Sequence, residues 1–344
     1  VAYRLRKKLQ GTGVQLVTAL VKQAAHVDHF QRSPQWIMPV LDCEYSDEDK
    51  ARFRADPDAI DAIRYDPEYI GNVRRFNDAI VDPKSDAMQI IAGIVRDHLE
   101  SAVADPVRRA ALRRDDVAAR KRLIYAPSYY AAVQRPNVAV VRDPIVRVEA
   151  EGVRTQDGAL HPTDVIILAT GFHADKFVRP INPIGRDGVT LYSLWARRAS
   201  AFLAVSLPDF PNFFMLNGPT GPVGNFSLID IAEAQWGYID QLLDLLRTGQ
   251  AGAISASPAA MADYEERRLA AAKTTVFASG CSSWYLDREG VPQCWPWTYD
   301  QFFDDMRAPD LADLIELLAP EQRVALIQAL GPSLGFDVLS ELDN

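Results

Sequence analysis

The stretch DVIILATGF, residues Asp164 to Phe172, is an apolar run that enters a turn of small residues. The apolar residues from Val165 to Leu168 are typical of a buried parallel β-strand. The small residues that follow, Ala169, Thr170 and Gly171, allow a backbone to approach a dinucleotide closely. The stretch therefore predicts an α/β fold and places Ala169, Thr170 and Gly171 among the cofactor-binding residues.

A second nucleotide-binding pattern lies near the first residue. Apolar residues at helical spacing predict a helix over Thr12–Ala25, and His26–Phe30 is predicted to be a short strand. In a βαβ unit a strand should precede that helix, but four basic residues between Arg4 and Lys8 make a poor buried strand. Gly11-Thr12-Gly13 holds only the end of a GxGxxG turn, with Thr12 and Gly13 as candidate phosphate contacts. We expect a truncated beginning that binds a pyrophosphate poorly.

The remaining chain predicts several further elements. A charged helical insertion is expected over about residues 46–120, broken at prolines, and the clearest helix is Leu228–Leu246, followed by Gly249. Two weaker helices are expected from Leu311 onward. The shorter predictions are strands at Val138–Val141, Ile145–Val148 and Phe213–Leu216, and a hairpin turn at Asp157-Gly158.

Composition narrows the class of protein. The 344 residues are 48% hydrophobic with a net charge of -9, which argues against a general nucleic-acid-binding surface. Three scattered cysteines suit a reducing cytoplasm, and no apolar run approaches the length of a membrane span. We find no signal peptide. The five histidines have no metal-ligand spacing, so no metal site is predicted.

Five blocks of the sequence, in the same order, resemble the Baeyer–Villiger monooxygenases, which are class B flavoprotein monooxygenases. The resemblance runs from about Gly11 to Asp310. The blocks are TGVQLVTALVKQAAHVDHFQRSPQWIMP from Thr12, KRLIYAPSYYAAVQRPNV from Lys121, DVIILATGF from Asp164, PDFPNFFMLNGPTGPVGNFSLIDIAEAQ from Pro208 and SSWYLDREGVPQCWPWT from Ser282.

The resemblance implies FAD and NADPH as cofactors, and O2 and a small carbonyl compound as substrates. It implies a Rossmann-like NADPH-binding domain at residues 1–171, the C-terminal part of an FAD-binding domain at 172–310, and a helical tail at 311–344. The first FAD-binding βαβ unit of the family, and its fingerprint of a histidine followed by Trp-Pro, have no counterpart here. We therefore expect FAD to bind weakly or not at all.

Candidate site residues come from position and from the resemblance. Arg32 and Ser33 follow the second strand of the βαβ unit, where an arginine suits the 2′-phosphate of NADPH; the alternative is a solvated surface arginine. By resemblance, Lys121 would contact that phosphate. Arg122 would be catalytic, stabilising the peroxyflavin anion and orienting the nicotinamide. The alternative for both is a solvated basic helix face beginning at Arg108.

The resemblance also implies contacts from the later blocks. Gly224, Asn225 and Ser227 precede the best helix, whose N-terminus points at the flavin in the family; the alternative is an ordinary capped loop, and both can hold together. Trp284 lies in a loop that the family closes over nicotinamide and substrate. The alternative, an aromatic residue packed on the core, is the interpretation we prefer for Trp295 and Trp297.

Two other functions remain open on the sequence. The same flavin chemistry could oxygenate nitrogen or sulfur instead of a ketone. A truncated chain could also be an inactive remnant or a binding module without FAD, and retained flavin would separate these possibilities.

Overall fold

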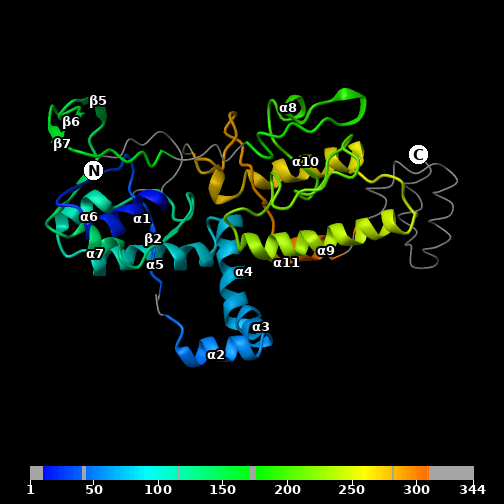
Figure 1. Ribbon diagram of the computed structural model, residues 1–344, viewed down its shortest axis with the longest axis horizontal. Helices are drawn as coiled ribbons and strands as arrows, with labels where there is room; N and C mark the ends of the chain where they lie inside the picture. The colour runs from blue at the N-terminus through cyan, green and yellow to red at the C-terminus, as the bar shows by residue number, and fades with distance from the viewer. Residues whose placement is uncertain are drawn as a thin grey trace. The chain divides into compact units, whose positions relative to one another are not determined.

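The computed structural model describes residues 11–40, 44–114, 116–170, 176–280, 283–307 and 309. The chain divides into two compact units, which are described separately. The first unit is Val1–Gly71 with Pro83–Ala174, and the second is Asn72–Asp82 with Asp175–Asn344 (Figure 1). The division is nested, because a short piece from the first half of the chain belongs to the second unit. The boundary predicted at residue 171, between the NADPH-binding domain and the FAD-binding domain, stays a prediction.

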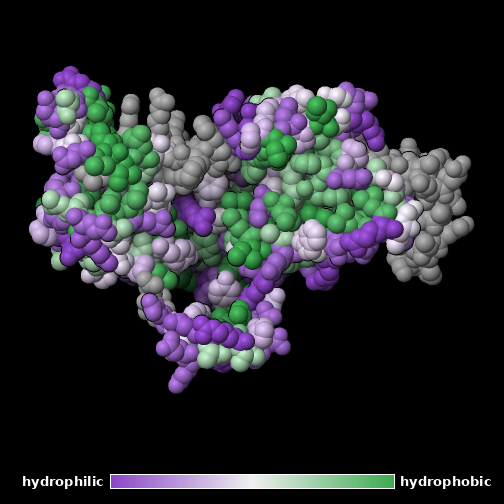
Figure 2. Space-filling view, viewed as in Figure 1, coloured by the Kyte–Doolittle hydropathy of each residue, from purple (hydrophilic) through white to green (hydrophobic). Residues whose placement is uncertain are grey.

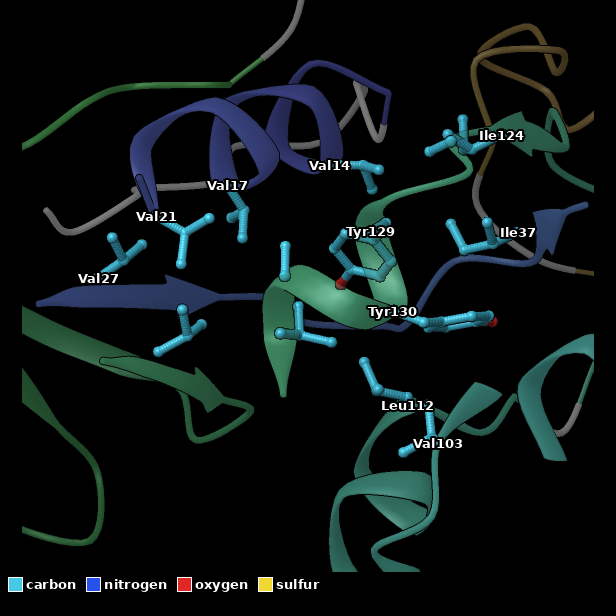
Figure 3. Close-up of a cluster of buried hydrophobic side chains, with 14 of the residues drawn as sticks. Val14, Val17, Val21, Val27, Ile37, Val103, Leu112, Ile124, Tyr129 and Tyr130 are labelled. Atoms are coloured by element: carbon cyan, nitrogen blue, oxygen red, sulfur yellow. The ribbon is translucent and has the colours of Figure 1, made fainter. Parts of the chain in front are cut away.

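The first unit is built on a helix and two parallel strands. Helix α1 (Gly11–Leu20) packs beside β1 (Val27–Phe30), which pairs in parallel with β4 (Val138–Val141). The predicted helix and strand are thus confirmed, although α1 ends at Leu20. Val14 and Val17 of α1, and Val21 in the turn after it, point toward the core, where Tyr129 and Tyr130 lie (Figure 3). All five side chains are buried, so the stripe predicted from helical spacing faces the core.

A second parallel pair lies close to the first in sequence. Strand β2 (Ile37–Met38) pairs with β3 (Ile124–Tyr125), and the short helix α7 (Tyr129–Val133) follows. The two strands are only two residues long, too short to show any periodicity in the sequence. Between them lies the whole helical insertion.

The insertion consists of helices joined by prolines and polar caps. The helices are α2 (Asp47–Ala55), α3 (Asp58–Arg64), α4 (Pro67–Val81), α5 (Asp86–Ala102) and α6 (Pro106–Leu112). Ser85 caps α5 by accepting from the Met88 amide, and Asp105 caps α6, which begins at Pro106. Helices α2 and α3 have no buried residue, and Figure 2 shows mainly hydrophilic residues over α2. The predicted helical insertion is confirmed.

The hairpin predicted at Asp157-Gly158 is also present. It joins β6 (Gly152–Thr155) to β7 (Leu160–Pro162), and β5 (Ile145–Glu149) completes an antiparallel sheet with β6 in the middle. Gly158 has φ +87°, which the turn requires, and the Thr155 hydroxyl donates to Asp157. The predicted strands at Val138–Val141 and Ile145–Val148 are confirmed with it.

Two strand predictions are wrong. Residues 165–168 form no strand apart from a single bridge at Ile166, and Val165 and Leu168 are 55% and 61% exposed. A parallel strand is buried only when neighbouring strands satisfy its backbone groups, and no strand of the described residues flanks this run. Residues 213–216 are a bent loop, in which the Met215 amide donates to the Val205 carbonyl. Phe213 packs in the cluster around Phe210, and Phe214 packs against the core that contains α9.

The described part of the second unit is mainly helical. Its helices are α8 (Leu191–Leu194), α9 (Leu228–Arg247), α10 (Pro258–Ala272) and α11 (Tyr299–Asp305), with 3-10 turns η1 (Arg186–Gly188) and η2 (Val276–Ala278). The core joins Ile231, Ile239 and Leu242 of α9 to Trp295 and Phe302. The long predicted helix is confirmed as α9, and Gly249 follows it with φ +72°.

The helices of both units, together with the strands of the first unit, agree with the predicted α/β class. The helices predicted after Leu311 lie outside the described residues. Within the described ranges, no helix is long and apolar enough to cross a membrane.

Candidate functional site

The carboxyl end of β1 brings together residues far apart in the chain. Ser33 follows β1, and the Lys121 ammonium lies 3.4 Å from its hydroxyl oxygen across 88 positions of sequence. The Gln35 amide donates to the Ser33 carbonyl at 3.2 Å, and Pro34 restricts Ser33 to extended backbone. Arg32 is exposed beside them. A lysine, a hydroxyl and an exposed arginine at one strand end form a cluster suited to an anion.

The basic run upstream of Lys121 is not a solvated helix face. Helix α6 ends at Leu112, ahead of Lys121 and Arg122. Arg108 donates to the Val133 carbonyl at 3.1 Å, and Arg109 to the Val103 carbonyl at 2.8 Å. Arg114 is buried. These arginines fasten the helix to its surroundings, so the alternative interpretation of Lys121 and Arg122 as part of one basic face is wrong.

The approach to Lys121 is a turn rather than a helix. Ala119 is buried and has φ +60°, a left-handed conformation that favours glycine. Arg122 is exposed, and Tyr125 lies near it. Burial raises the pKa of Tyr125, and the Arg122 charge opposes that rise. Arg122 is thus a solvent-facing cation next in sequence to Lys121 of the cluster formed by Arg32, Ser33 and Lys121.

The N-terminus of α1 carries the other expected phosphate contacts. Thr12 is exposed on the first turn, whereas Gly13 is buried against β1. A Cβ at Gly13 would lie 3.5 Å from the Nε2 atom of His29, which is an ordinary van der Waals contact, so alanine would also fit there. Burial lowers the pKa of His29 to about 4, and its Nδ1 atom lies 3.4 Å from the Tyr129 hydroxyl. A neutral imidazole therefore lies below this end of the helix.

Ala169, Thr170 and Gly171, the predicted cofactor contacts, follow the exposed run at residues 165–168. Ala169 is buried in the core of the first unit, and Thr170 is half-buried. Gly171 lies outside the described residues. The structure therefore places Ala169 as a packing residue.

In the second unit, the residues before α9 are engaged in their own fold. Ser227 is the N-cap, and its hydroxyl accepts from the amides of Ile229 and Asp230 at 3.3 and 3.4 Å. Gly224 has φ +94°, and a Cβ there would lie 2.1 Å from the Tyr285 hydroxyl. Only glycine fits this position, because both the backbone conformation and the tyrosine exclude a side chain.

Asn225 points into the core. It is 2% exposed, and its amide nitrogen donates to Asn77 Oδ1 at 2.8 Å and to the Trp295 carbonyl at 3.3 Å. Asn77, in α4, donates in turn to the Trp297 carbonyl at 3.1 Å. This buried amide pair ties the loop before α9 to the tryptophan segment. Sequence reasoning did not find Asn77, since nothing marks one asparagine in a charged helical region.

Trp284 belongs to an aromatic stack. Its ring centroid lies 4.0 Å from that of Tyr285, which lies 4.0 Å from that of Phe277. Trp284 is half-buried, whereas Tyr285 is 1% exposed. Trp295 is fully buried and Trp297 packs against its core, as preferred from the sequence.

Buried arginines anchor the segment that carries Trp284. Arg268 is 0% exposed, pairs with Glu265 and donates to the Pro292 carbonyl at 3.0 Å. Arg198 donates to Asp287 at 2.6 Å. These anchors were missed because Pro292 and Asp287, which they hold, lie 24 and 89 positions away along the chain. In the parts of the chain that the structure describes, no group of three or more His, Cys, Asp or Glu side chains is placed to hold a metal ion.

Comparison with known proteins finds relatives that are named monooxygenases. No protein-family model matches the chain. An uncharacterized monooxygenase of Mycobacterium tuberculosis is 38% identical over 83% of this chain, and a Baeyer–Villiger monooxygenase of Streptomyces coelicolor is 31% identical over 90%. The crystal structure of cyclohexanone monooxygenase from Rhodococcus sp. Phi1 bound to NADP+ matches with a TM-score of 0.70 and 26% identity, over 87% of this chain and 63% of that one.

The chain spans 57% and 60% of the length of the two relatives. The family resemblance predicted from the five sequence blocks is confirmed, as is the shorter length of the chain. The relatives are named monooxygenases, which agrees with the predicted oxidoreductase class. NADP is named with the matched crystal structure, and other matched relatives are named FAD-binding monooxygenases.

Proposed function

We propose that this chain, which is homologous to the Baeyer–Villiger monooxygenases, serves an NADPH- and FAD-dependent enzyme that inserts one oxygen atom from O2 into a ketone. We further propose that its first unit binds the nicotinamide nucleotide. The observation that carries the proposal is the meeting of Ser33 and Lys121 at the end of β1. The carboxyl ends of parallel strands are where α/β sheets bind nucleotides.

The cluster at this strand end fits NADPH. The Lys121 ammonium and the Ser33 hydroxyl can both donate to a phosphate, and the exposed Arg32 guanidinium can make a bidentate contact. In a Rossmann unit this position faces the adenosine ribose. We therefore assign the 2′-phosphate of NADPH to Arg32, Ser33 and Lys121, and the pyrophosphate to the first turn of α1 at Thr12 and Gly13.

The loop before α9 fits FAD only in part. Gly224 keeps the loop free of a side chain, but the hydroxyl of Ser227 and the amide nitrogen of Asn225 already have partners within the unit. Ala169 is buried in the core of the first unit. We propose that the loop before α9, with Gly224 as its side-chain-free position, shapes one wall of a flavin site.

When bound, FAD supplies the oxygen chemistry, and the residues of this chain supply position and charge. Lys121, Ser33 and Arg32 hold the adenosine end of the nucleotide. Arg122 provides a permanently charged guanidinium that stabilises negative charge near the reacting atoms. Trp284, on its aromatic stack, provides a partly exposed apolar face that we assign to the nicotinamide and substrate side.

Titration with nucleotides tests the first part of the proposal. NADPH should bind more tightly than NADH, and Arg32→Ala or Lys121→Ala should each remove up to about 1.5–3 kcal/mol of NADPH binding, the scale of a hydrogen bond to a charged group. NADH binding should change little in either variant. Equal affinities for the two nucleotides in the unmodified chain would contradict the assignment.

Flavin content and product analysis test the rest. The chain alone should lose FAD on gel filtration, whereas a fusion to the N-terminal portion of the Streptomyces coelicolor relative should retain it. In that fusion Arg122→Ala should lower oxygenation by roughly 10²–10³ while NADPH affinity is largely kept. Ketone, sulfide and amine substrates assayed side by side distinguish Baeyer–Villiger activity from heteroatom oxygenation. Full activity of Arg122→Ala would remove the catalytic assignment.

A further inference from the structure

Arg114 is a buried cation that joins two segments of the first unit. Its side chain is 4% exposed, and its Nη1 atom donates to the Pro34 carbonyl at 2.6 Å across 80 positions of sequence. Its Nε and Nη2 atoms both donate to the Asp116 carboxylate. The Asp116 carbonyl in turn accepts from the Trp36 indole at 3.3 Å. The guanidinium therefore contacts Pro34 and, through Asp116, Trp36.

These contacts hold the two segments together on one side of the Ser33–Lys121 contact. The β2–β3 pair holds them together on the other side. The Ile124 amide donates to the Trp36 carbonyl at 3.1 Å, and Ile37 pairs with Ile124 directly after it. Ser33 lies just before the first attachment in one segment, and Lys121 lies between the two attachments in the other. Their 3.4 Å contact thus depends on how the two segments are held together.

We propose that Arg114 is a positioning residue for recognition of the 2′-phosphate, acting through Pro34 and Asp116 and not by touching the nucleotide. This inference rests on the nicotinamide site proposed above. The donors of Arg114 are directed at protein oxygens, and its side chain is almost fully buried. It therefore holds the two segments in position and does not contact the nucleotide. Only a planar guanidinium can hold a carboxylate with two nitrogens and a carbonyl with a third.

The conservative variant Arg114→Lys separates geometry from charge. A lysine keeps the positive charge beside Asp116, so the electrostatic field at the cluster is preserved, but it lacks the fork that reaches Pro34. Arg113→Lys is the matched control, because Arg113 is the exposed neighbour and pairs with Glu100 at 3.2 Å on another helix.

Calorimetric titration with 2′,5′-ADP and with 5′-AMP measures the effect. The unmodified chain and Arg113→Lys should prefer the 2′-phosphorylated nucleotide, and Arg114→Lys should lose about tenfold of that preference while 5′-AMP affinity stays the same. If Arg114 had only a structural role, its replacement would weaken the binding of both nucleotides equally. Trp36→Phe, which removes the indole donor to Asp116, should lower the same preference to a smaller extent.

Each outcome has one meaning. Unchanged preference in a folded Arg114→Lys protein overturns the positioning role, and so does an equal loss for both nucleotides. If Arg114→Lys does not fold, unchanged preference in Trp36→Phe overturns it instead. No preference in the unmodified chain overturns the nicotinamide site itself, which is a separate failure that the control nucleotide identifies.

Discussion

Two short runs of the first unit differ in burial in a way that their hydropathy does not predict. Val27–Phe30 includes an aspartate and a histidine, yet all four residues are buried in β1. Val165–Leu168 is wholly apolar, yet Val165 and Leu168 are more than half exposed. The less apolar run is the buried one. The difference lies in what surrounds each run rather than in its composition.

Strand β1 has a neighbouring strand and partners for both of its polar side chains. Its backbone pairs with β4 along all four residues. The Asp28 carboxylate lies 3.2 Å from His26 and 3.7 Å from His161, and His29 lies against Tyr129. In the described residues, the run from 165 to 168 makes only one bridge, at Ile166. Burial of a strand is thus a property of the sheet that receives it.

The largest effect should come from placing a charge in each run. Val27→Asp puts a carboxylate at a position with 0% exposure, and we expect it to destabilise the protein by about 3–5 kcal/mol or to prevent folding. Val165→Asp should change stability by no more than about 0.5 kcal/mol, because the side chain already faces solvent. Urea denaturation measures both. A large loss of unfolding free energy in Val165→Asp would show that residues 165–168 are buried in solution. It would contradict the difference between the two runs.

A smaller effect should come from protonating the histidine of β1. Burial lowers the pKa of His29 from 6.5 to about 4, so the unfolded chain binds the proton more readily than the folded one. Stability should therefore fall as the pH drops from about 6.5 toward 4, by up to about 3 kcal/mol. Urea midpoints measured across this range report the slope.

Two variants identify the group responsible for that slope. His29→Gln cannot titrate and should flatten the His29 contribution. His26→Gln, at an exposed position, should leave that contribution in place. An unchanged slope in His29→Gln would assign the pH dependence elsewhere.

The smallest effect should come from the hydrogen bonds beside the two runs. The Asn137 amide donates to the carbonyls of Val21 and Ala24 at 3.1 and 3.0 Å, joining the end of α1 to the start of β4. Asn137→Ala should cost about 1–2 kcal/mol, since it leaves two acceptors unpaired. The Thr163 hydroxyl donates to Val165 on an exposed surface, and Thr163→Ala should cost at most a few tenths of a kcal/mol. Thermal unfolding measures the stability lost in each variant. Similar losses in Asn137→Ala and Thr163→Ala would mean that the surroundings of both runs are equally ordered.

Elements with their own local signals were predictable from the sequence. Helices α1 and α9 each carry a long apolar stripe, and the β6–β7 hairpin has its Asp157-Gly158 turn. No prediction covered β2 and β3, because two-residue strands have no period. Helices α7, α8, α10 and α11 were missed as well; α10 has a weak apolar stripe rich in alanine. The two wrong strands had strand-like composition, but neither pairs with a strand of the described residues.

The candidate site shows the same division. Arg32 and Ser33 could be placed from their position after a strand, and Lys121 from the family resemblance. The residues that hold them, Arg114 and Asp116, could not be found, because a buried arginine looks like any other member of a basic run. Asn77 was hidden for the same reason, since its partner Asn225 lies 148 positions away. Contacts across long sequence separations leave no local pattern.

Helix α4 gives the chain an unusual order of assembly. Residues 72–82 belong to the second unit, although the chain returns to the first unit from Pro83 to Ala174. During synthesis these residues emerge long before the rest of their unit, and until it arrives Asn77, which ends fully buried, lacks its partners Asn225 and Trp297. Neither unit can be excised as one continuous piece, and a cut at residue 175 would separate the second unit from a part of its own interior.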